Sequence, residues 1–229
     1  RDVYKRQVIS YKASDDFKNF LKTKGFSFIE TIANPNLDPR IDDHPDLSLF
    51  KIDHKTLVVD ESVFSYYEEK LEGYDLIKGD KVGEKYPQDA LYNLVRFKDF
   101  YIHNDFTEKN IENFLIEKGL SHLKVNQGYT RCSLIPLGDL LVTSDYGIYK
   151  ALKNKVDIEL VDNDKVILDG FDQGFLGGTC GLVGNQLIFS GDISRNKAFV
   201  KIEEICENKN IDIIYPKTEL IDLGSIIEI

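Results

Sequence analysis

The chain has 229 residues, of which 42% are hydrophobic and 30% are charged, and its formal net charge is −10. This balance is typical of a globular protein, argues against nucleic-acid binding and favours a cationic small molecule as partner. No apolar run approaches the roughly 18 residues of a membrane helix, and no signal peptide opens the chain, so we expect no membrane association and a cytoplasmic location.

The opening residues 1–7 are polar and without pattern, and the sequence contains no methionine. We therefore expect a processed chain or a fragment, with residues 1–7 either unstructured or left over from its assembly. No linker rich in Pro, Gly or Ser interrupts the sequence, so one domain over residues 1–229 is expected.

Four short apolar runs recur at intervals of about 45 residues, at 56–60, 100–105, 140–145 and 187–192. Their apolar, mostly β-branched or aromatic composition predicts strands. Each run contains an aspartate at or near its end that could cap a following helix, and these are Asp60, Asp105, Asp145 and Asp192. A helix over 108–118 and closing strands at 158–161 and 211–215 complete the pattern.

A second strand precedes each run across a turn, such as Gly138-Asp139 or Gly184-Asn185. The chain ends then provide two halves of a fifth unit, a back half over 8–29 and a front half over 219–229. We predict an α/β class with a five-fold pseudosymmetric propeller, built from strand-hairpin-helix-strand units and closed by pairing the two halves. An open α/β sheet is the alternative.

The first candidate site lies in residues 42–50, which contain His44, Pro45 and Asp46. The residue before proline favours extended geometry, and side chains in an extended chain alternate between faces. We therefore expect His44 and Asp46 on one face, with Asp42 close by. An N-terminal loop with a surface histidine and capping aspartates explains the same pattern.

The second candidate is Cys132 in the segment 127–137, at a point in its unit that nearly matches that of Asp46. Cys132 is expected in the first strand of its unit, facing the same central pocket. A thiol beside a protonated histidine has a lowered pKa and is a competent nucleophile. A small buried core cysteine is the competing interpretation.

The third candidate is the glycine-rich segment 170–181, which matches neither a dinucleotide nor a phosphate-binding fingerprint. It contains Cys180, a rival for the central thiol. No cofactor is expected. The remaining cysteine, Cys206, forms no CxxC pair, and with only four histidines in the chain no metal site is expected.

The repeat, the His-x-Asp-x-x-x-Phe stretch from His44 and the Gly-Tyr-Thr-Arg-Cys-Ser stretch around Cys132 resemble the guanidino-group-modifying enzymes, or penteins. This resemblance implies an acid/base role for His44, a guanidinium-holding carboxylate in Asp46 and a nucleophile in Cys132. Asp42 and Arg131, which lie close to these residues in sequence, are added as candidate substrate-binding residues.

The sequence departs from the family in its order, because the cysteine lies in mid-chain and not near the end. The chain therefore looks circularly permuted. Gly177-Gly178 stands where the resemblance places one further carboxylate, so Asp172 would have to substitute for it, and Asp222 stands where the other is expected.

Two functions remain open. The first is a cysteine-dependent hydrolase or transferase that acts on a C–N bond of a guanidine or amidine through a covalent thiol intermediate. The second is a non-catalytic binding or assembly module, since one fold can serve unrelated functions.

Overall fold

The computed structural model describes residues 6–229, which form an α/β fold with five small sheets. Each sheet has a central strand that pairs antiparallel with one neighbour and parallel with the other. This confirms the α/β class. In sheet order the strands are β15 (Ile227–Glu228), β1 (Arg6–Ile9) and β2 (Ser27–Glu30); β3 (Leu49–Lys51), β4 (Thr56–Asp60) and β5 (Asp75–Gly79); β6 (Val95–Phe97), β7 (Phe100–His103) and β8 (Ser121–Lys124); β9 (Leu134–Leu137), β10 (Leu140–Thr143) and β11 (Ile158–Leu160); β12 (Cys180–Val183), β13 (Gln186–Phe189) and β14 (Asp212–Ile214).

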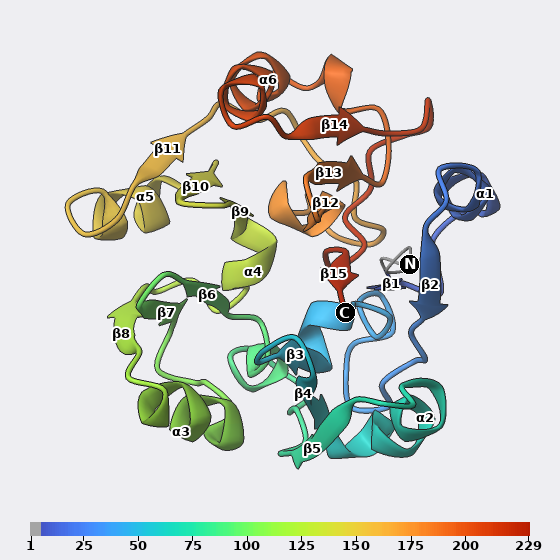
Figure 1. The fold of residues 1–229 in the computed structure, drawn as a ribbon, viewed down its shortest axis with the longest axis vertical. Helices are drawn as coiled ribbons and strands as arrows, with labels where there is room; N and C mark the ends of the chain where they lie inside the picture. The colour runs from blue at the N-terminus through green and yellow to red at the C-terminus, as the bar shows by residue number, and fades with distance from the viewer. Residues whose placement is uncertain (1–5) are drawn as a thin grey trace.

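A helix connects each central strand to its parallel neighbour, as a parallel crossover requires. These helices lie towards the outside of Figure 1, with the sheets set around the middle of the molecule. They are α1 (Asp15–Thr23), α2 (Phe64–Lys70), α3 (Lys109–Glu117), α5 (Tyr146–Leu152) and α6 (Phe199–Asn208). The shorter elements are α4 (Thr130–Ser133) and the 3₁₀ turns η1 (Pro45–Leu47), η2 (Glu61–Val63), η3 (Gln88–Ala90), η4 (Gly177–Thr179) and η5 (Ile193–Arg195). Within residues 6–229, no helix is both long and apolar enough to cross a bilayer.

One of the four predicted helix caps is confirmed, because Asp145 accepts a hydrogen bond from Ile148 N at the start of α5. Asp60 and Asp192 also accept from backbone N–H groups, but they cap the 3₁₀ turns η2 and η5 that come before α2 and α6. Asp105 does not cap α3; the carboxylate of Glu108 accepts from Ile111 N in its place. A glutamate is longer than the usual capping residues, so the composition of this loop did not reveal it.

The two ends of the described chain pair with each other. Gln7 lies opposite Glu228, and Val8 lies opposite Ile227, in the antiparallel pairing of β1 with β15. The expectation that residues 1–7 take no part in the fold is therefore wrong for Arg6 and Gln7, which belong to β1. Residues 1–5 of that prediction lie outside the described part of the chain.

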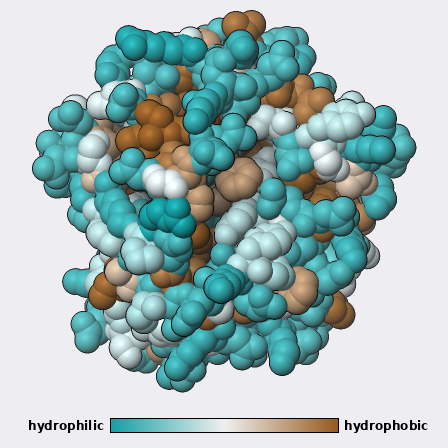
Figure 2. Space-filling view, turned by 180° about the vertical axis from the view of Figure 1, so that it is seen from behind, coloured by the Kyte–Doolittle hydropathy of each residue, from teal (hydrophilic) through white to brown (hydrophobic). Residues whose placement is uncertain are grey.

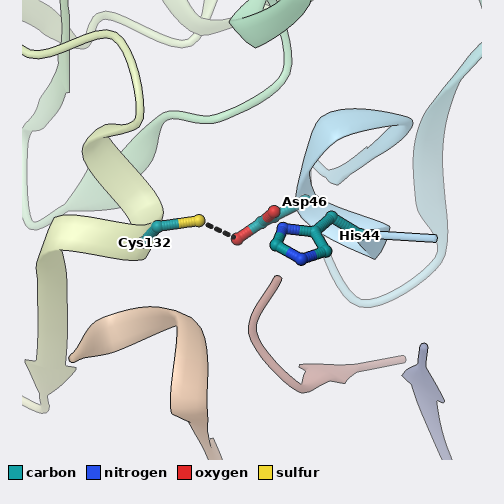
Figure 3. A group of neighbouring side chains, drawn as sticks. All are labelled: His44, Asp46 and Cys132. Carbon is teal, nitrogen blue, oxygen red and sulfur yellow. Dashed lines mark hydrogen bonds between the residues drawn. The ribbon is translucent and has the colours of Figure 1, made fainter. Parts of the chain in front are cut away.

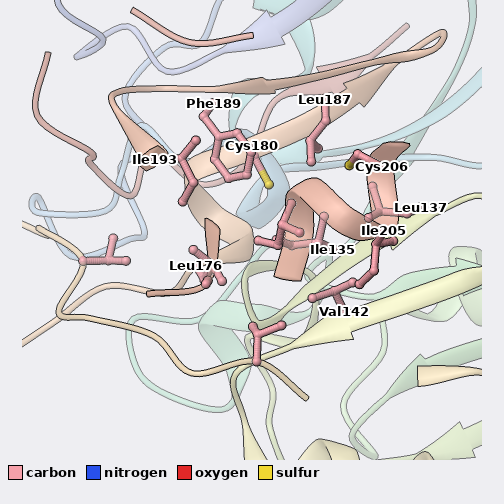
Figure 4. Close-up of a cluster of buried hydrophobic side chains, with 14 residues drawn as sticks. Ile135, Leu137, Val142, Leu176, Cys180, Leu187, Phe189, Ile193, Ile205 and Cys206 are labelled. Carbon is pink, nitrogen blue, oxygen red and sulfur yellow. The ribbon is translucent and has the colours of Figure 1, made fainter. Parts of the chain in front are cut away.

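The buried hydrophobic residues form five clusters, and each cluster draws on two sheets that are neighbours in Figure 1. The largest joins β9 and β10 to β12, β13 and α6, and it contains Cys180 and Cys206 beside Leu187 and Phe189 (Figure 4). The five sheets are not joined into one hydrogen-bonded sheet, so hydrophobic packing between neighbouring sheets holds them together. The face in Figure 2 is largely hydrophilic, with hydrophobic residues gathered in recesses between the polar ones.

Candidate active site

The segments that lead into the first strand of each sheet supply the polar residues of the site. Asn93, Cys132, Gly178 and Ser225 each stand two residues before such a strand, and Asp46 stands three before β3. Hydrogen bonds join them across the units: Asn93 Nδ2 donates to Cys132 Sγ at 3.3 Å, and Ser225 Oγ donates to Asp46 Oδ2. Equivalent positions in the repeat therefore meet at one place.

His44, Asp46 and Cys132 lie together (Figure 3). The thiol of Cys132 donates to Asp46 Oδ2 at 3.0 Å, and one potential ligand atom of each of the three residues lies within 4.8 Å of the others. The three side chains are nearly inaccessible to solvent. Imidazole, carboxylate and thiol are also metal-ligating groups, so this set could hold a metal ion.

The local backbone differs from the sequence prediction in two places. His44 is extended, but Pro45 begins the 3₁₀ turn η1, so Asp46 is not in an extended chain. Proline suits the first position of a helical turn because its missing N–H needs no partner there. Cys132 lies in the short helix α4 immediately before β9 and not in the strand itself.

The electrostatic environment of Cys132 also differs from expectation. Burial raises the pKa of its thiol well above the ordinary value, and the carboxylates of Asp46 and Asp222 raise it further. The hydrogen bond from Asn93 acts in the opposite direction but is the smaller influence. The predicted lowering of the thiol pKa is therefore wrong, because the sulfur is buried and two carboxylates lie near it.

Both carboxylates are unusual as well. Burial raises the pKa of Asp46 and of Asp222, while the nearby His44 opposes this shift for each of them. Asp46 Oδ1 is buried and has no hydrogen-bond partner among the described residues. A buried acceptor of this kind is costly, and a bound cationic donor would relieve it.

Asp222 occupies the space in which a side chain at position 178 would lie. A Cβ built on Gly178 would come 2.0 Å from Asp222 Oδ1. The carboxylate is held by the backbone N–H groups of Phe175, at 2.8 Å to Oδ2, and Gly224, at 3.0 Å to Oδ1. Gly177 and Gly178 supply no acidic side chain, but Asp222 from the neighbouring unit places its carboxylate in the space beside Gly178.

A cavity of about 190 Å³ opens beside these groups, and His44, Cys132 and Asp222 line it together with Tyr129 and Phe175. The remaining lining residues are Ile41, Leu47, Leu168, Phe171 and Gln173. The thiol and the imidazole therefore reach one hollow, as a reaction between them and a small molecule requires.

Three candidates lie elsewhere. Asp42 accepts hydrogen bonds from Lys12 and Tyr11, and it does not line the cavity. Asp172 is exposed and does not line it either, although its neighbours Phe171 and Gln173 do. The prediction that Asp172 substitutes for the absent carboxylate is wrong, because Asp222 occupies that space.

Arg131 also does not line the cavity. Its guanidinium donates to the backbone carbonyls of Leu134, Gly177 and Cys180, and so ties α4 to η4 and β12. A guanidinium engaged in this way is structural, which corrects its assignment to substrate binding. Cys180 is fully buried in the hydrophobic core and does not line the cavity, whereas Cys132 does, so Cys180 is not placed to act as the nucleophile there.

The sequence interpretation missed Asn93 and Ser225. Asn93 Oδ1 accepts from the backbone N–H groups of Arg131, at 2.7 Å, and Cys132, at 3.2 Å, so that it fixes α4 as well as the thiol. The repeat itself could have revealed both residues, since each stands two residues before the first strand of its unit, as Cys132 does.

Comparison with known proteins adds the family. Residues 8–227 match a family described as "Family of unknown function (DUF6873)". The chain belongs to this family. No curated protein matches it in sequence.

Solved structures of similar fold include dimethylarginine dimethylaminohydrolase from Pseudomonas aeruginosa, as a Cys-to-Ser mutant complexed with citrulline. It shares 11% identity at a TM-score of 0.54, over 94% of this chain and 92% of that one. C. jejuni agmatine deiminase shares 12% identity at a TM-score of 0.54, over 93% of this chain and 76% of that one. The resemblance to the guanidino-group-modifying (pentein) superfamily is confirmed at the level of fold.

Proposed function

We propose that this protein is a cysteine-dependent hydrolase or transferase that cleaves a C–N bond of a guanidine or amidine. The observation that carries the proposal is that Cys132, His44 and the buried carboxylate of Asp222 line one small cavity, while the buried carboxylate of Asp46 lies against the Cys132 thiol. A nucleophile, an acid/base and a pair of anions are what the reaction of a planar cation requires. Solved structures of the same fold with names of this reaction class support it.

The carboxylate of Asp222 provides the binding step. A guanidinium or amidinium N–H group would donate to Asp222, which lines the cavity. Asp46 does not line it and lies beside Cys132, whose thiol donates to it at 3.0 Å. The bound positive charge offsets the two anions that raise the pKa of Cys132, so the thiol loses its proton more readily with substrate present.

The covalent step follows from the same geometry. His44 takes the proton of the Cys132 thiol, the thiolate attacks the planar carbon and forms an S–C bond, and the C–N bond to the departing amine breaks as His44 gives that amine the proton. His44 then takes a proton from a water molecule, or from an acceptor amine in a transferase. The oxygen or nitrogen attacks the carbon, the S–C bond breaks, and His44 returns its proton to the sulfur, which restores the thiol.

The proposal includes the closed ring of five units in a single domain. The pairing of β1 with β15 and the five hydrophobic clusters between neighbouring sheets support a five-fold propeller. A ring explains why residues from Asp46 to Ser225 reach a common centre. The circular permutation relative to other pentein enzymes stays a prediction.

The decisive variant is Cys132→Ala, which removes the nucleophile. We expect this variant to have no measurable turnover of any guanidine or amidine that the wild type converts, and mass spectrometry should find a substrate-derived adduct on Cys132 of the wild-type protein. The control is Cys180→Ala, because Cys180 lies in the core and should not affect the chemistry. Equal turnover by the Cys132 variant would refute the mechanism.

A non-catalytic binding module is the second candidate, and one observation favours it. Cys132 is only 2% exposed and its pKa is raised, which is also the description of an inert core thiol. The adduct experiment separates the two functions, since a binding module would retain the ligand without any covalent change at Cys132.

A further inference from the structure

The cavity beside Cys132 has an aromatic wall. The rings of Tyr129 and Phe175 pack with their centroids 5.8 Å apart. Phe171 lines the cavity from the loop above, and the guanidinium of Arg40 stacks on its ring at 4.1 Å. Arg40 also donates to the carbonyl of Gly170 at 2.6 Å, so Phe171 is held in place over the cavity.

Three aliphatic residues, Ile41, Leu47 and Leu168, also line the cavity, and Gln173 adds one uncharged polar side chain. Within the described chain, no lysine or arginine lines this cavity. The acidic or basic side chains among the lining residues described are His44 and Asp222, beside the thiol of Cys132 and the phenol of Tyr129. The space beyond the reacting groups is therefore uncharged and suited to a hydrocarbon group.

The adjoining hollow, which shares His44 and Asp222 with the cavity, does not supply a free cation. Its Lys12 pairs with Asp42 at 2.7 Å and Asp43 at 3.0 Å, and its Arg40 pairs with Asp38 at 2.6 Å. Further acidic residues line it: Asp16, Asp169 and Glu219. An anionic group on the ligand would meet negative charge on this side as well.

We propose that the substrate carries a short alkyl or aryl group on its guanidine or amidine and has no carboxylate. This inference rests on the proposed function, which places the guanidinium or amidinium group of the substrate beside Cys132 and Asp222. A hydrocarbon group against Phe171, Phe175 and Tyr129 gains free energy from burial, whereas a carboxylate there would be buried beside Asp222 without a counter-ion.

The test compares probes that differ at one group. Benzylguanidine and 4-methylpentylguanidine carry hydrocarbon ends, while 4-guanidinobutyrate replaces the branched end of the latter with a carboxylate of the same shape. Turnover is measured with the wild type, and Kd is measured by calorimetry with Cys132→Ser, which cannot complete the reaction. We expect both hydrocarbon probes to exceed 4-guanidinobutyrate by about tenfold or more in kcat/KM and in affinity.

A pair of variants locates the preference. Phe171→Ala removes part of the wall and should lower the affinity for benzylguanidine with little effect on that for unsubstituted guanidine. Phe106→Ala is the matched control, because Phe106 is 44% exposed and Phe171 is 39% exposed, but only Phe171 lines the cavity. Both side chains lie at the surface, so both variants should fold.

The outcomes separate this inference from the proposed function. Equal or better use of 4-guanidinobutyrate would overturn the apolar substrate class while leaving the thiol chemistry intact. Tight binding of the hydrocarbon probes without turnover or adduct would uphold the ligand class and refute the enzyme. Binding of none of the three probes to Cys132→Ser, or equal losses in the two phenylalanine variants, would overturn the inference.

Discussion

At the scale of single residues, the site buries two carboxyl groups away from water, which is unfavourable for their charged forms. Asp46 and Asp222 are both buried, and burial raises the pKa of each carboxyl group. Asp46 retains an oxygen without a partner among the described residues, although Cys132 and Ser225 donate to the other. The protein thus tolerates a cost that either a bound cation or protonation of the carboxylate would offset, as is common at functional sites.

This cost predicts a pH-dependent effect of Asp46→Asn on stability. A carboxyl group whose pKa folding raises contributes stability below its unfolded pKa and loses that contribution as the pH rises through its folded pKa. The variant should therefore have a higher Tm than the wild type at pH 8, and this advantage should vanish at pH 4. We expect a gain of about 1 kcal/mol or more, or roughly 2–4 °C for a chain of this size.

Thermal unfolding of both proteins from pH 4 to pH 8 measures the difference. The matched control is Asp172→Asn, because Asp172 is exposed and should give no such trend. A difference in Tm that stays constant across this range would show that the charge on Asp46 does not destabilise the fold.

At the scale of elements, the short segments before each first strand build the site, and neighbouring segments compensate for each other. Gly178 leaves the room that the carboxylate of Asp222 fills, and the backbone of Gly178 accepts hydrogen bonds from Leu223 and Ser225. Two segments that are far apart in sequence therefore share one position at the centre. Because the two segments are closely packed, a larger side chain on one of them fits only if the other segment moves or has a smaller side chain.

Gly178→Ala tests this arrangement. Its Cβ would lie 2.0 Å from Asp222 Oδ1, so the carboxylate must move. We expect a loss of about 1–3 kcal/mol of stability, and weaker binding of guanidine. Combining it with Asp222→Ala should recover part of the stability loss, because the clash disappears, and a double-mutant cycle on the free energy of unfolding measures this coupling.

Gly147→Ala is the matched control for the glycine substitution. A Cβ at Gly147 would meet only Asp145 Oδ1, at 3.0 Å, at the start of helix α5, so a small adjustment accommodates it. Additive effects of Gly178→Ala and Asp222→Ala would indicate that the two positions do not share the space.

At the scale of the whole molecule, five small sheets depend on one another. None exceeds three strands, which is near the minimum for a stable sheet, and each contributes to two of the five clusters between neighbours. Stability is therefore a property of the whole set of sheets. The chain ends matter to it, because β15 contributes the third strand to the sheet of β1 and β2.

Removing Ile227–Ile229 tests that dependence. The truncation deletes both residues of the pairing with β1 and the buried Ile229, whose backbone N–H donates to Arg6 O at 2.8 Å. We expect a loss of several kcal/mol, seen as a lower Tm and a lower denaturant midpoint. An unchanged Tm would mean that the described ends do not stabilise the fold together.

The sequence by itself determined the repeat. Strand composition, turn pairs and capping aspartates are local properties, so the unit, the division of one unit between the chain ends and the approximate positions of His44, Asp46 and Cys132 could be predicted from it. The same locality explains the errors. The 3₁₀ turn at Pro45 and the cap at Glu108 depend on hydrogen bonds that composition does not specify.

Only the tertiary structure decided which side chains meet. It placed Asn93, Asp222 and Ser225 around Cys132, directed Arg131 towards backbone carbonyls and left Asp42 and Asp172 outside the cavity. It also raised the thiol pKa that a neighbouring histidine was expected to lower. The pKa of a side chain depends on its burial and on charges from residues far away in the sequence. Both are fixed only when the units have packed against one another, so they cannot be inferred from the sequence.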